Sequence, residues 1–277
     1  MDFSAKNAFV DLPYDENEQM ADSFPLNIVS GGSHLFGYLL KPDSRYKKTY
    51  PAVIMFHGFP GYTTNNDLEY ALMRMGAVVI HVNHRGAWGS GGSYLFSNLT
   101  EDAEAVAKWA HNQAVAKKYE IDVNKIFLAG HSMGGMTVLN GAKKLEFVRG
   151  VIAMAPYDLH AAFENNLTEE LFEMIEGEGQ CLKMESAAAV YENAEQNHQR
   201  LSVEKTAEHL KNFPVLLVSA EKDTVAPPEL MIDPLFHELE KSGADVEKYS
   251  MNTNHCFGGM RVELAEVLGS WIEKKLL

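Results

Sequence analysis

The sequence of 277 residues contains little cysteine, and its basic residues are outnumbered by acidic ones. Only Cys181 and Cys256 are present, which argues against a disulfide framework and is typical of a cytoplasmic protein. Lysine and arginine together number 24, against 38 aspartate and glutamate residues, so the net charge is −14. Because the nucleic-acid backbone is also negatively charged, we expect no nucleic-acid partner.

The sequence also lacks long apolar runs and the usual metal-binding spacings. Nowhere do about 18 apolar residues follow one another, so no membrane span is expected. The first 20 residues have neither a cationic start nor an apolar stretch, which argues against a secretory signal. Neither His-Glu-x-x-His nor Cys-x-x-Cys occurs, so we expect no metal.

What the sequence does contain is an alternation of short apolar segments with longer amphipathic ones. The apolar segments have the composition of strands that are buried on both faces of a sheet. We expect such strands over residues 51–58, 77–86, 125–130, 150–156 and 214–223, a weaker one over 245–251, and an antiparallel strand over 34–42. Helices are expected over residues 101–119, with Thr100 as the N-cap, and over 136–145, 228–243 and 261–277.

Alternating strands and helices predict an α/β fold with a mostly parallel central sheet of about eight strands, flanked by helices on both faces. A chain that is 46% hydrophobic can bury a large core, and we expect one domain over residues 1–277. Residues 159–212 interrupt the alternation, because they contain no convincing strand. We interpret them as a helical cap or lid insertion over one end of the sheet.

Residues 127–136 read FLAGHSMGGM and join the end of an apolar strand to the start of a helix. A serine at the centre of Gly-x-Ser-x-Gly between a strand and a helix is typical of a nucleophile elbow. The glycines are needed because side chains there would collide with neighbouring backbone. The pattern predicts Ser132 as a nucleophile, with the N-terminus of the following helix beneath the developing negative charge.

A serine nucleophile needs a histidine base and an acid, which follow it along the chain in hydrolases of this kind. We favour His255, because it lies in a short polar loop between the last expected strand and the last helix. Asp223, in the loop after an apolar strand, is the favoured acid, with Asp158 as the main rival and Glu221 as a weaker one. The other histidines after Ser132 lie in or beside the insertion or within a helical pattern: His160, His198, His209 and His237.

Acyl transfer also requires two N–H donors for the oxyanion. Met133, directly after the nucleophile, is expected to supply one. In the turn HGFPG, Pro60 has no N–H and restricts the residue before it, so Phe59 is the expected second donor. His57 is interpreted as a structural residue that hydrogen-bonds this turn. Residues 85–93 lack the Gly-Lys-Ser/Thr of a phosphate loop and are interpreted as a loop at the pocket, with Trp88 lining it.

The insertion provides further candidates for substrate binding. Its apolar side chains at spacings of three and four predict one apolar helix face, formed by Phe163, Leu167, Leu171, Phe172, Met174 and Ile175. Two arrangements remain open. The face packs against the insertion itself or the sheet edge, or it roofs the acyl or alcohol pocket, with Phe163 and Phe172 in contact with the substrate.

With these segments the sequence resembles the α/β-hydrolase family, from roughly Asn27 to the C-terminus. The matching segments, in the family's order, are HGFPG, NHRGAWGSGG, GHSMGG, SAEKDTVAPP and NHCF. The first two are similar to those of the cinnamoyl (feruloyl) esterase and acyl-peptidase/prolyl-oligopeptidase-like branches. The resemblance implies a triad of Ser132, Asp223 and His255. It also implies oxyanion donors at Phe59 and Met133. Asn254 departs from the pattern, because relatives often carry aspartate before the catalytic histidine.

The motifs and the resemblance lead to one functional expectation, a serine hydrolase that cleaves small-molecule carboxylic esters through an acyl-enzyme, without a cofactor. The alternative is a serine peptidase that uses the same triad on short peptides or acyl-amino acids. A third possibility is a hydrolase-like binding protein without catalysis, and the presence of all five site elements argues against it.

Overall fold

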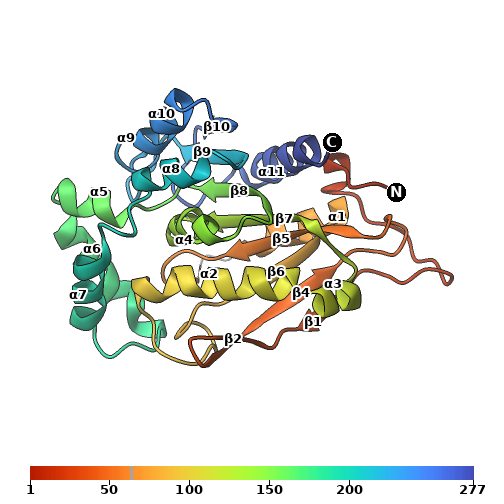
Figure 1. Ribbon diagram of the computed structural model, residues 1–277, viewed down its shortest axis with the longest axis horizontal. Helices are drawn as coiled ribbons and strands as arrows, with labels where there is room; N and C mark the ends of the chain where they lie inside the picture. The colour runs from red at the N-terminus through yellow and green to blue at the C-terminus, as the bar shows by residue number, and fades with distance from the viewer. Residues whose placement is uncertain (63–64) are drawn as a thin grey trace.

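The computed structural model describes residues 1–62 and 65–277 and is built around one sheet of eight strands (Figure 1). Their order across the sheet is β1-β4-β6-β5-β7-β8-β9-β10. In that order the strands are Asp22–Pro25, Gly37–Lys41, Val78–Val82, Tyr50–Phe56, Ile121–His131, Val148–Met154, Val215–Ala220 and Val246–Met251. Strand β4 is antiparallel to β1 and β6, and all other neighbours are parallel. The expected mostly parallel sheet is therefore confirmed.

A small hairpin, β2 (Ile28–Ser30) and β3 (Ser33–Leu35), lies outside this sheet. The α-helices are α1 (Asn66–Met75), α2 (Phe96–His111), α3 (Gln113–Tyr119), α4 (Met133–Gly141), α5 (Leu159–Glu164), α6 (Thr168–Glu178), α7 (Ala187–Asn197), α8 (Ala207–Leu210), α9 (Pro228–Met231), α10 (Asp233–Lys241) and α11 (Arg261–Leu276). Short 3₁₀ turns are η1 (Ala5–Asn7), η2 (Ala142–Lys144), η3 (Gly179–Cys181) and η4 (Glu204–Thr206).

Three element boundaries differ from the expectation. The strand expected over residues 34–42 is divided between β3 and β4. Thr100 is not an N-cap, because α2 already begins at Phe96, and the helix is broken at Asn112, whose side chain caps α3. The helix expected over 228–243 is divided at Ile232, because a proline lacking an N–H is accommodated in the first turn of a new helix, α10.

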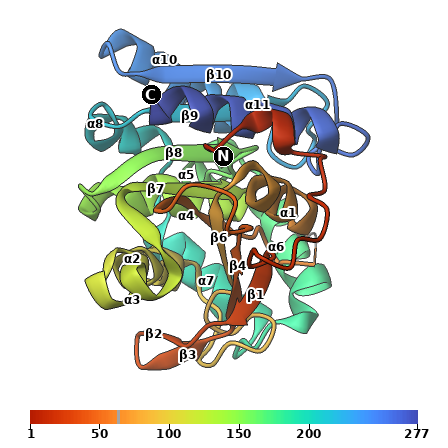
Figure 2. The same ribbon diagram turned by 90° about the vertical axis from the view of Figure 1, so that its right-hand side faces the viewer.

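Alternate residues of the central strands face two separate apolar cores, because successive side chains of a strand point to opposite faces. On one face, Val53 and Met55 of β5 pack with α1 and α11. On the other face, Ala52 and Ile54 pack with α2, α4 and α10. Figure 2 shows α1 and α2 on opposite sides of the sheet. All seven residues of β5 are buried, which explains why its sequence is continuously apolar.

Helix α4 lies very close to the central strands, and glycines make this approach possible. A Cβ added at Gly134 would lie 2.2 Å from the carbonyl oxygen of Phe56, at the end of β5. A Cβ at Gly130 would lie 2.2 Å from the carbonyl oxygen of Gly134. Atoms cannot approach so closely, so neither position has space for a side chain.

The connection from β8 to β9 contains α5 to α8, and Figure 1 places α5, α6 and α7 beyond the carboxyl ends of the parallel strands. Asp158, which directly precedes α5, joins the start of this segment to the backbone at the start of η4. Its Oδ1 accepts a hydrogen bond from the N–H of His160 at 2.8 Å. Its Oδ2 accepts from the N–H groups of Val203 at 2.9 Å and Glu204 at 3.3 Å. Burial raises the pKa of Asp158 to about 6, although these N–H groups favour the ionised form.

The raised pKa of Asp158 predicts a pH-dependent contribution to stability. The folded state holds the proton more tightly than the unfolded chain, whose carboxyl titrates near 3.8. The free energy of unfolding therefore falls as the pH rises from about 4 to about 6, by roughly 3 kcal/mol for this group. Urea unfolding of the wild type and Asp158→Asn across this range tests it. The contributions of other carboxylates cancel when the unfolding free energy of the variant is subtracted from that of the wild type. A difference that does not change with pH would contradict the prediction.

The close approach of α4 predicts opposite effects of two glycine substitutions. Gly134→Ala should lower the free energy of unfolding by about 1–3 kcal/mol, because the added methyl group overlaps the backbone of β5. Gly177→Ala in α6 is the matched control, since its Cβ would meet nothing within 4 Å. It should raise the stability by up to about 1 kcal/mol, because alanine favours the helix. Equal denaturation midpoints for wild type and Gly134→Ala would show that the close contact between α4 and β5 does not exclude a side chain at position 134.

Candidate active site

Three side chains with the chemistry of a hydrolase lie at the carboxyl ends of parallel strands. Ser132 follows β7 directly, Asp223 follows β9 by three residues, and His255 follows β10 by four. Because the strands are parallel, their carboxyl ends lie along the same edge of the sheet. The fold therefore brings these three residues, which are far apart in the sequence, to the same edge of the sheet.

Ser132 occupies a strained turn between β7 and α4. Its φ of 55° and ψ of −121° lie outside the regions that non-glycine residues usually adopt. The backbone is held by hydrogen bonds on both sides. The Ser132 N–H donates to the carbonyl of Met154 at 2.8 Å, and the Ser132 carbonyl accepts from Tyr157 N–H at 3.1 Å and Met136 N–H at 3.2 Å. The expected strand–turn–helix around the serine is thus present.

The imidazole of His255 is paired with the carboxylate of Asp223. The distance from His255 Nδ1 to Asp223 Oδ2 is 2.7 Å. The other oxygen of Asp223 accepts hydrogen bonds from the N–H groups of Val225 at 2.9 Å and Ala226 at 2.7 Å, which fix the carboxylate. Because an ionised carboxylate only accepts, Nδ1 of His255 carries the hydrogen and Nε2 has a free lone pair. This is the tautomer that a general base requires.

The structure separates the candidate acids. Asp158 binds the backbone of residues 160, 203 and 204 and caps a helix instead of pairing with His255. Glu221 is exposed, and its N–H donates to the carbonyl of Met251. Of the three carboxylates, Asp223 is the one hydrogen-bonded to His255.

His131 supports His255, a contact that the sequence did not indicate. Its Nε2 lies 2.8 Å from the carbonyl oxygen of His255, and the two rings are 4.8 Å apart. Burial lowers the pKa of His131 to about 3, so the ring is neutral and Nε2–H donates to that carbonyl. His131 stands between a glycine and the nucleophile in the GHSMGG motif, and this position is the signal that could have identified it.

The turn after β5 lies against Ser132. A Cβ on Gly58 would come within 3.0 Å of the Ser132 Cβ and 3.5 Å of its Oγ. Phe59, the next residue, packs its ring against Tyr94 and Phe96, with centroid distances of 5.6 and 6.0 Å. Met133 is the first residue of α4, where the N–H has no acceptor within the helix. The backbone amides of both expected donors therefore belong to segments that adjoin Ser132.

The buried ring of His57 hydrogen-bonds the turn after β5, as expected from the sequence. One ring nitrogen, Nδ1, lies 2.7 Å from the Gly58 carbonyl, and the other, Nε2, accepts from the N–H of His84 at 3.2 Å. Burial, together with the nearby His84, lowers the pKa of His57 to about 3. The neutral ring therefore donates with Nδ1 and accepts with Nε2.

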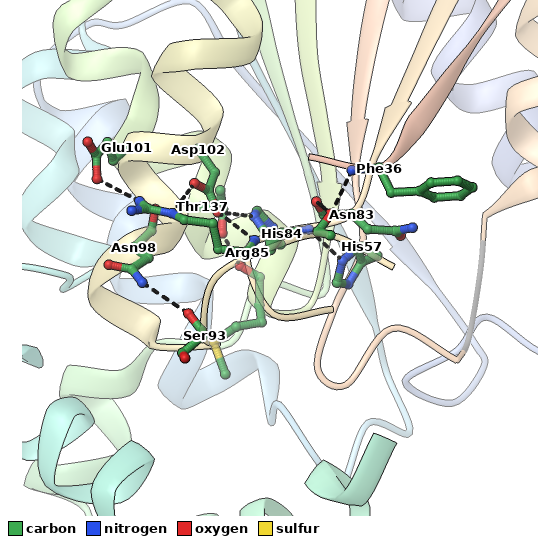
Figure 3. A network of polar contacts seen from close by, with 12 residues as sticks. Phe36, His57, Asn83, His84, Arg85, Ser93, Asn98, Glu101, Asp102 and Thr137 are labelled. Atoms are coloured by element: carbon green, nitrogen blue, oxygen red, sulfur yellow. Dashed lines mark hydrogen bonds and ion pairs between the residues drawn. The ribbon is translucent and has the colours of Figure 1, made fainter. Parts of the chain in front are cut away.

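The contact with His84 connects the turn to a buried ionic network (Figure 3). His84 Nδ1 lies 3.5 Å from Asp102, and Arg85 binds the same carboxylate through Nε at 2.7 Å and its own N–H at 3.0 Å. The Arg85 guanidinium also reaches Glu101 at 2.6 Å. Burial alone would raise the pKa of Asp102, but the contacts with His84 and the Arg85 N–H outweigh it, and the pKa is lowered. The network fixes the loop after β6 against the turn after β5.

The structure places the three expected substrate-binding aromatics at two separate locations. Trp88 donates its Nε1–H to the carbonyl of Pro60 at 2.9 Å and so borders the turn after β5. Phe163 lies 5.9 Å from the ring of Tyr191 and stacks on His198 at 4.5 Å. Phe172 contacts the same Tyr191 at 5.5 Å. The two phenylalanines therefore pack against α7. The single helix face expected from the sequence is divided between α5 and α6, and its Leu167 and Met174 line a pocket instead, so each of the two open arrangements holds for part of the face.

A pocket of about 280 Å³ opens beside Asp223. Its walls are formed by Tyr157, by the loop that follows Asp223, and by one side of α6 with the preceding Leu167. Within the part of the chain that the structure describes, no group of three or more histidine, cysteine, aspartate or glutamate residues could hold a metal ion. None of the described helices has both the length and the apolar character needed to cross a membrane.

Comparisons with known proteins agree with this geometry. The family model described as the alpha/beta hydrolase fold matches residues 56–258, which include Ser132, Asp223 and His255. A comparison with curated proteins finds no match. Many solved structures share the fold.

Among the solved structures is Est1E from Butyrivibrio proteoclasticus, with a TM-score of 0.66 and 18% identity over 91% of this chain and 98% of that one. An esterase from Pyrobaculum calidifontis has a TM-score of 0.68 and 20% identity over 94% and 88% of the two chains. The acylaminoacyl peptidase of Pyrococcus horikoshii has a TM-score of 0.69 and 17% identity over 93% of this chain, which spans only 42% of that protein. Identities this low show a common fold and leave the substrate open. The family match, which covers most of the sequence, shows that this chain belongs to the α/β-hydrolase family.

Proposed function

We propose that the protein is a serine hydrolase that cleaves small-molecule carboxylic esters with a triad of Ser132, His255 and Asp223. The observation that carries the proposal is the 2.7 Å hydrogen bond between His255 Nδ1 and Asp223, at the sheet edge where Ser132 occupies its strained turn. No cofactor enters the proposal, because the three side chains supply the nucleophile, the base and the acid.

In the proposed reaction, Ser132 Oγ attacks the ester carbonyl carbon while His255 Nε2 takes the hydroxyl proton. The negative charge moves to the carbonyl oxygen, where the N–H groups of Phe59 and Met133 stabilise it. The C–O bond to the alcohol breaks, and His255 returns its proton to the leaving oxygen. Water then attacks the acyl-enzyme by the same route and releases the carboxylic acid and free Ser132.

The same triad could cleave short peptides or acyl-amino acids, and the substrate class is tested directly. A panel of p-nitrophenyl and hydroxycinnamoyl esters is compared with aminoacyl amides, with the Ser132→Ala protein as the blank. An esterase turns over the esters at much higher kcat/KM than the amides, because an amine is a poorer leaving group than an alcohol. Amide turnover equal to ester turnover would assign a peptidase.

Replacement of the nucleophile gives the first test of catalysis. Ser132→Ala should lower kcat by about 10⁴–10⁶-fold, because only binding and oxyanion stabilisation remain. The variant should fold normally and should no longer be labelled by a fluorophosphonate probe. Turnover close to that of the wild type would end the serine-hydrolase proposal, and circular dichroism serves as the folding control.

Two aspartate variants test the assignment of the acid. Asp223→Asn should lower kcat by about 10⁴-fold with little change in substrate binding, since the amide no longer fixes the tautomer of His255. Asp158→Asn is the matched control, a buried carboxylate that also follows a strand but does not contact His255. At a temperature where it is fully folded, its kcat should remain close to the wild-type value. A reversed order of the two effects would move the acid to Asp158.

A further inference from the structure

The pocket beside Asp223 combines an apolar wall with two carboxylates. Helix α6 and the residue before it present Leu167, Glu170, Met174 and Glu178 to the pocket. The last three are four residues apart and therefore lie on one helix face, with about 12 Å of helix between the two glutamates. Tyr157 and Val225 lie among the lining residues of the strand-end loops. The pocket is thus open to solvent, with an apolar wall and with exposed carboxylates at two positions along α6.

This pocket adjoins the proposed triad through the backbone. Tyr157 donates its N–H to the carbonyl of Ser132, and Val225 donates its N–H to the carboxylate of Asp223. A group that fills the pocket therefore lies against residues whose backbone hydrogen-bonds Ser132 and Asp223. Its volume of about 280 Å³ lies at the low end for binding sites, so it accommodates one end of a substrate.

The two carboxylates are held at the pocket without a cationic partner. Glu178 Oε2 accepts a hydrogen bond from the hydroxyl of Tyr62 at 2.8 Å, which links α6 to the turn after β5. Among the residues that the structure describes, neither Glu170 nor Glu178 forms an ion pair, and no basic side chain lines the pocket. Burial and the nearby Glu170 raise the pKa of Tyr157 to about 12, so the ring beside the pocket stays neutral. Both glutamates are exposed, so water, and at Glu178 the Tyr62 hydroxyl, are their present partners.

The charge of Glu170 and Glu178 determines which chemical group of a substrate the pocket can bind. A neutral apolar group would fill the apolar wall but would displace water from the carboxylates without replacing its interactions. An anionic group would be repelled. An organic cation on an apolar stem satisfies both surfaces, because its methylene or methyl groups contact Leu167 and Met174 while its charge faces the glutamates and the ring of Tyr157.

We propose that the pocket lined by Tyr157, Glu170, Met174 and Glu178 binds an alkylammonium group, so that the preferred substrates are esters that carry an organic cation. The proposal rests on the proposed function, of which it names the substrate class. It assigns the specificity to α6 of the insertion, and in particular to its two pocket-facing glutamates.

Matched ester pairs test the proposal. In the first pair the cation is in the alcohol: 2-(trimethylammonio)ethyl butyrate is compared with its carbon analogue, 3,3-dimethylbutyl butyrate. In the second pair it is in the acyl group: the p-nitrophenyl esters of 4-(trimethylammonio)butyric acid and 5,5-dimethylhexanoic acid are compared. At least one pair should show about a five- to twentyfold higher kcat/KM for the cationic ester, and added salt should reduce the preference. No preference in either pair would overturn the proposal.

Variants on α6 locate the effect. Glu170→Gln/Glu178→Gln should bring the kcat/KM ratio of the responsive pair close to one. Glu176→Gln is the matched control, because Glu176 is exposed on the opposite side of the same helix and does not line the pocket. It removes the same charge and should leave the ratio unchanged. A preference that survives in the double variant, or one that Glu176→Gln removes equally, would contradict the assignment.

A binding measurement separates this proposal from the catalytic one. Butyltrimethylammonium is titrated by calorimetry into the Ser132→Ala protein, where no ester is cleaved. Binding that weakens in the Glu170→Gln/Glu178→Gln background supports the pocket even if the wild type hydrolyses no ester. Absence of binding, in a protein whose wild type does cleave neutral esters, would reject the cationic pocket and leave the proposed hydrolase intact.

Discussion

The arrangement of the candidate site depends on how closely α4 approaches the central strands. Glycine at positions 130 and 134 lets the backbone of the helix lie against β5 and β7 at distances that no side chain would allow. This approach brings the turn at Gly58 into contact with Ser132, and the N–H of Met133, which has no acceptor within the helix, follows Ser132 directly. Two segments that are far apart in the sequence thus come to surround one hydroxyl group.

Asp158 and Asp223 show how similar local structures acquire different chemistry. Both are buried carboxylates after a parallel strand, and both accept backbone N–H groups of the segment that follows. The difference is the partner of the remaining oxygen, since one faces the backbone at Val203 and the other faces His255. The rest of the polar framework, from His57 to Asp102, likewise fixes loops.

The sequence predicted those strands and turns that are determined by residues adjacent in the chain. Continuous apolar runs located the buried strands, and the Gly-x-Ser-x-Gly pattern located the turn at Ser132, because both depend on neighbouring residues. Asp223 could be preferred but not separated from Asp158, since only the folded chain shows which carboxylate reaches His255. The position of Phe163 against α7 and the charge of the pocket were also inaccessible, because they depend on how the insertion packs against distant loops.

Asp158 hydrogen-bonds the backbone at both His160 and Val203, so the segment between these two residues is a loop closed on a fixed base. The entropy of closing such a loop changes slowly with length, at about 0.6 kcal/mol for each doubling. A change in the number of residues between His160 and Val203 therefore adds little closure entropy, and the larger cost falls on buried side chains of this segment, such as Leu171 and Ile175, which pack in the same core as the strands. Changes in length thus cost least in the exposed turns of the segment, while its buried helix faces remain fixed to the sheet beneath them.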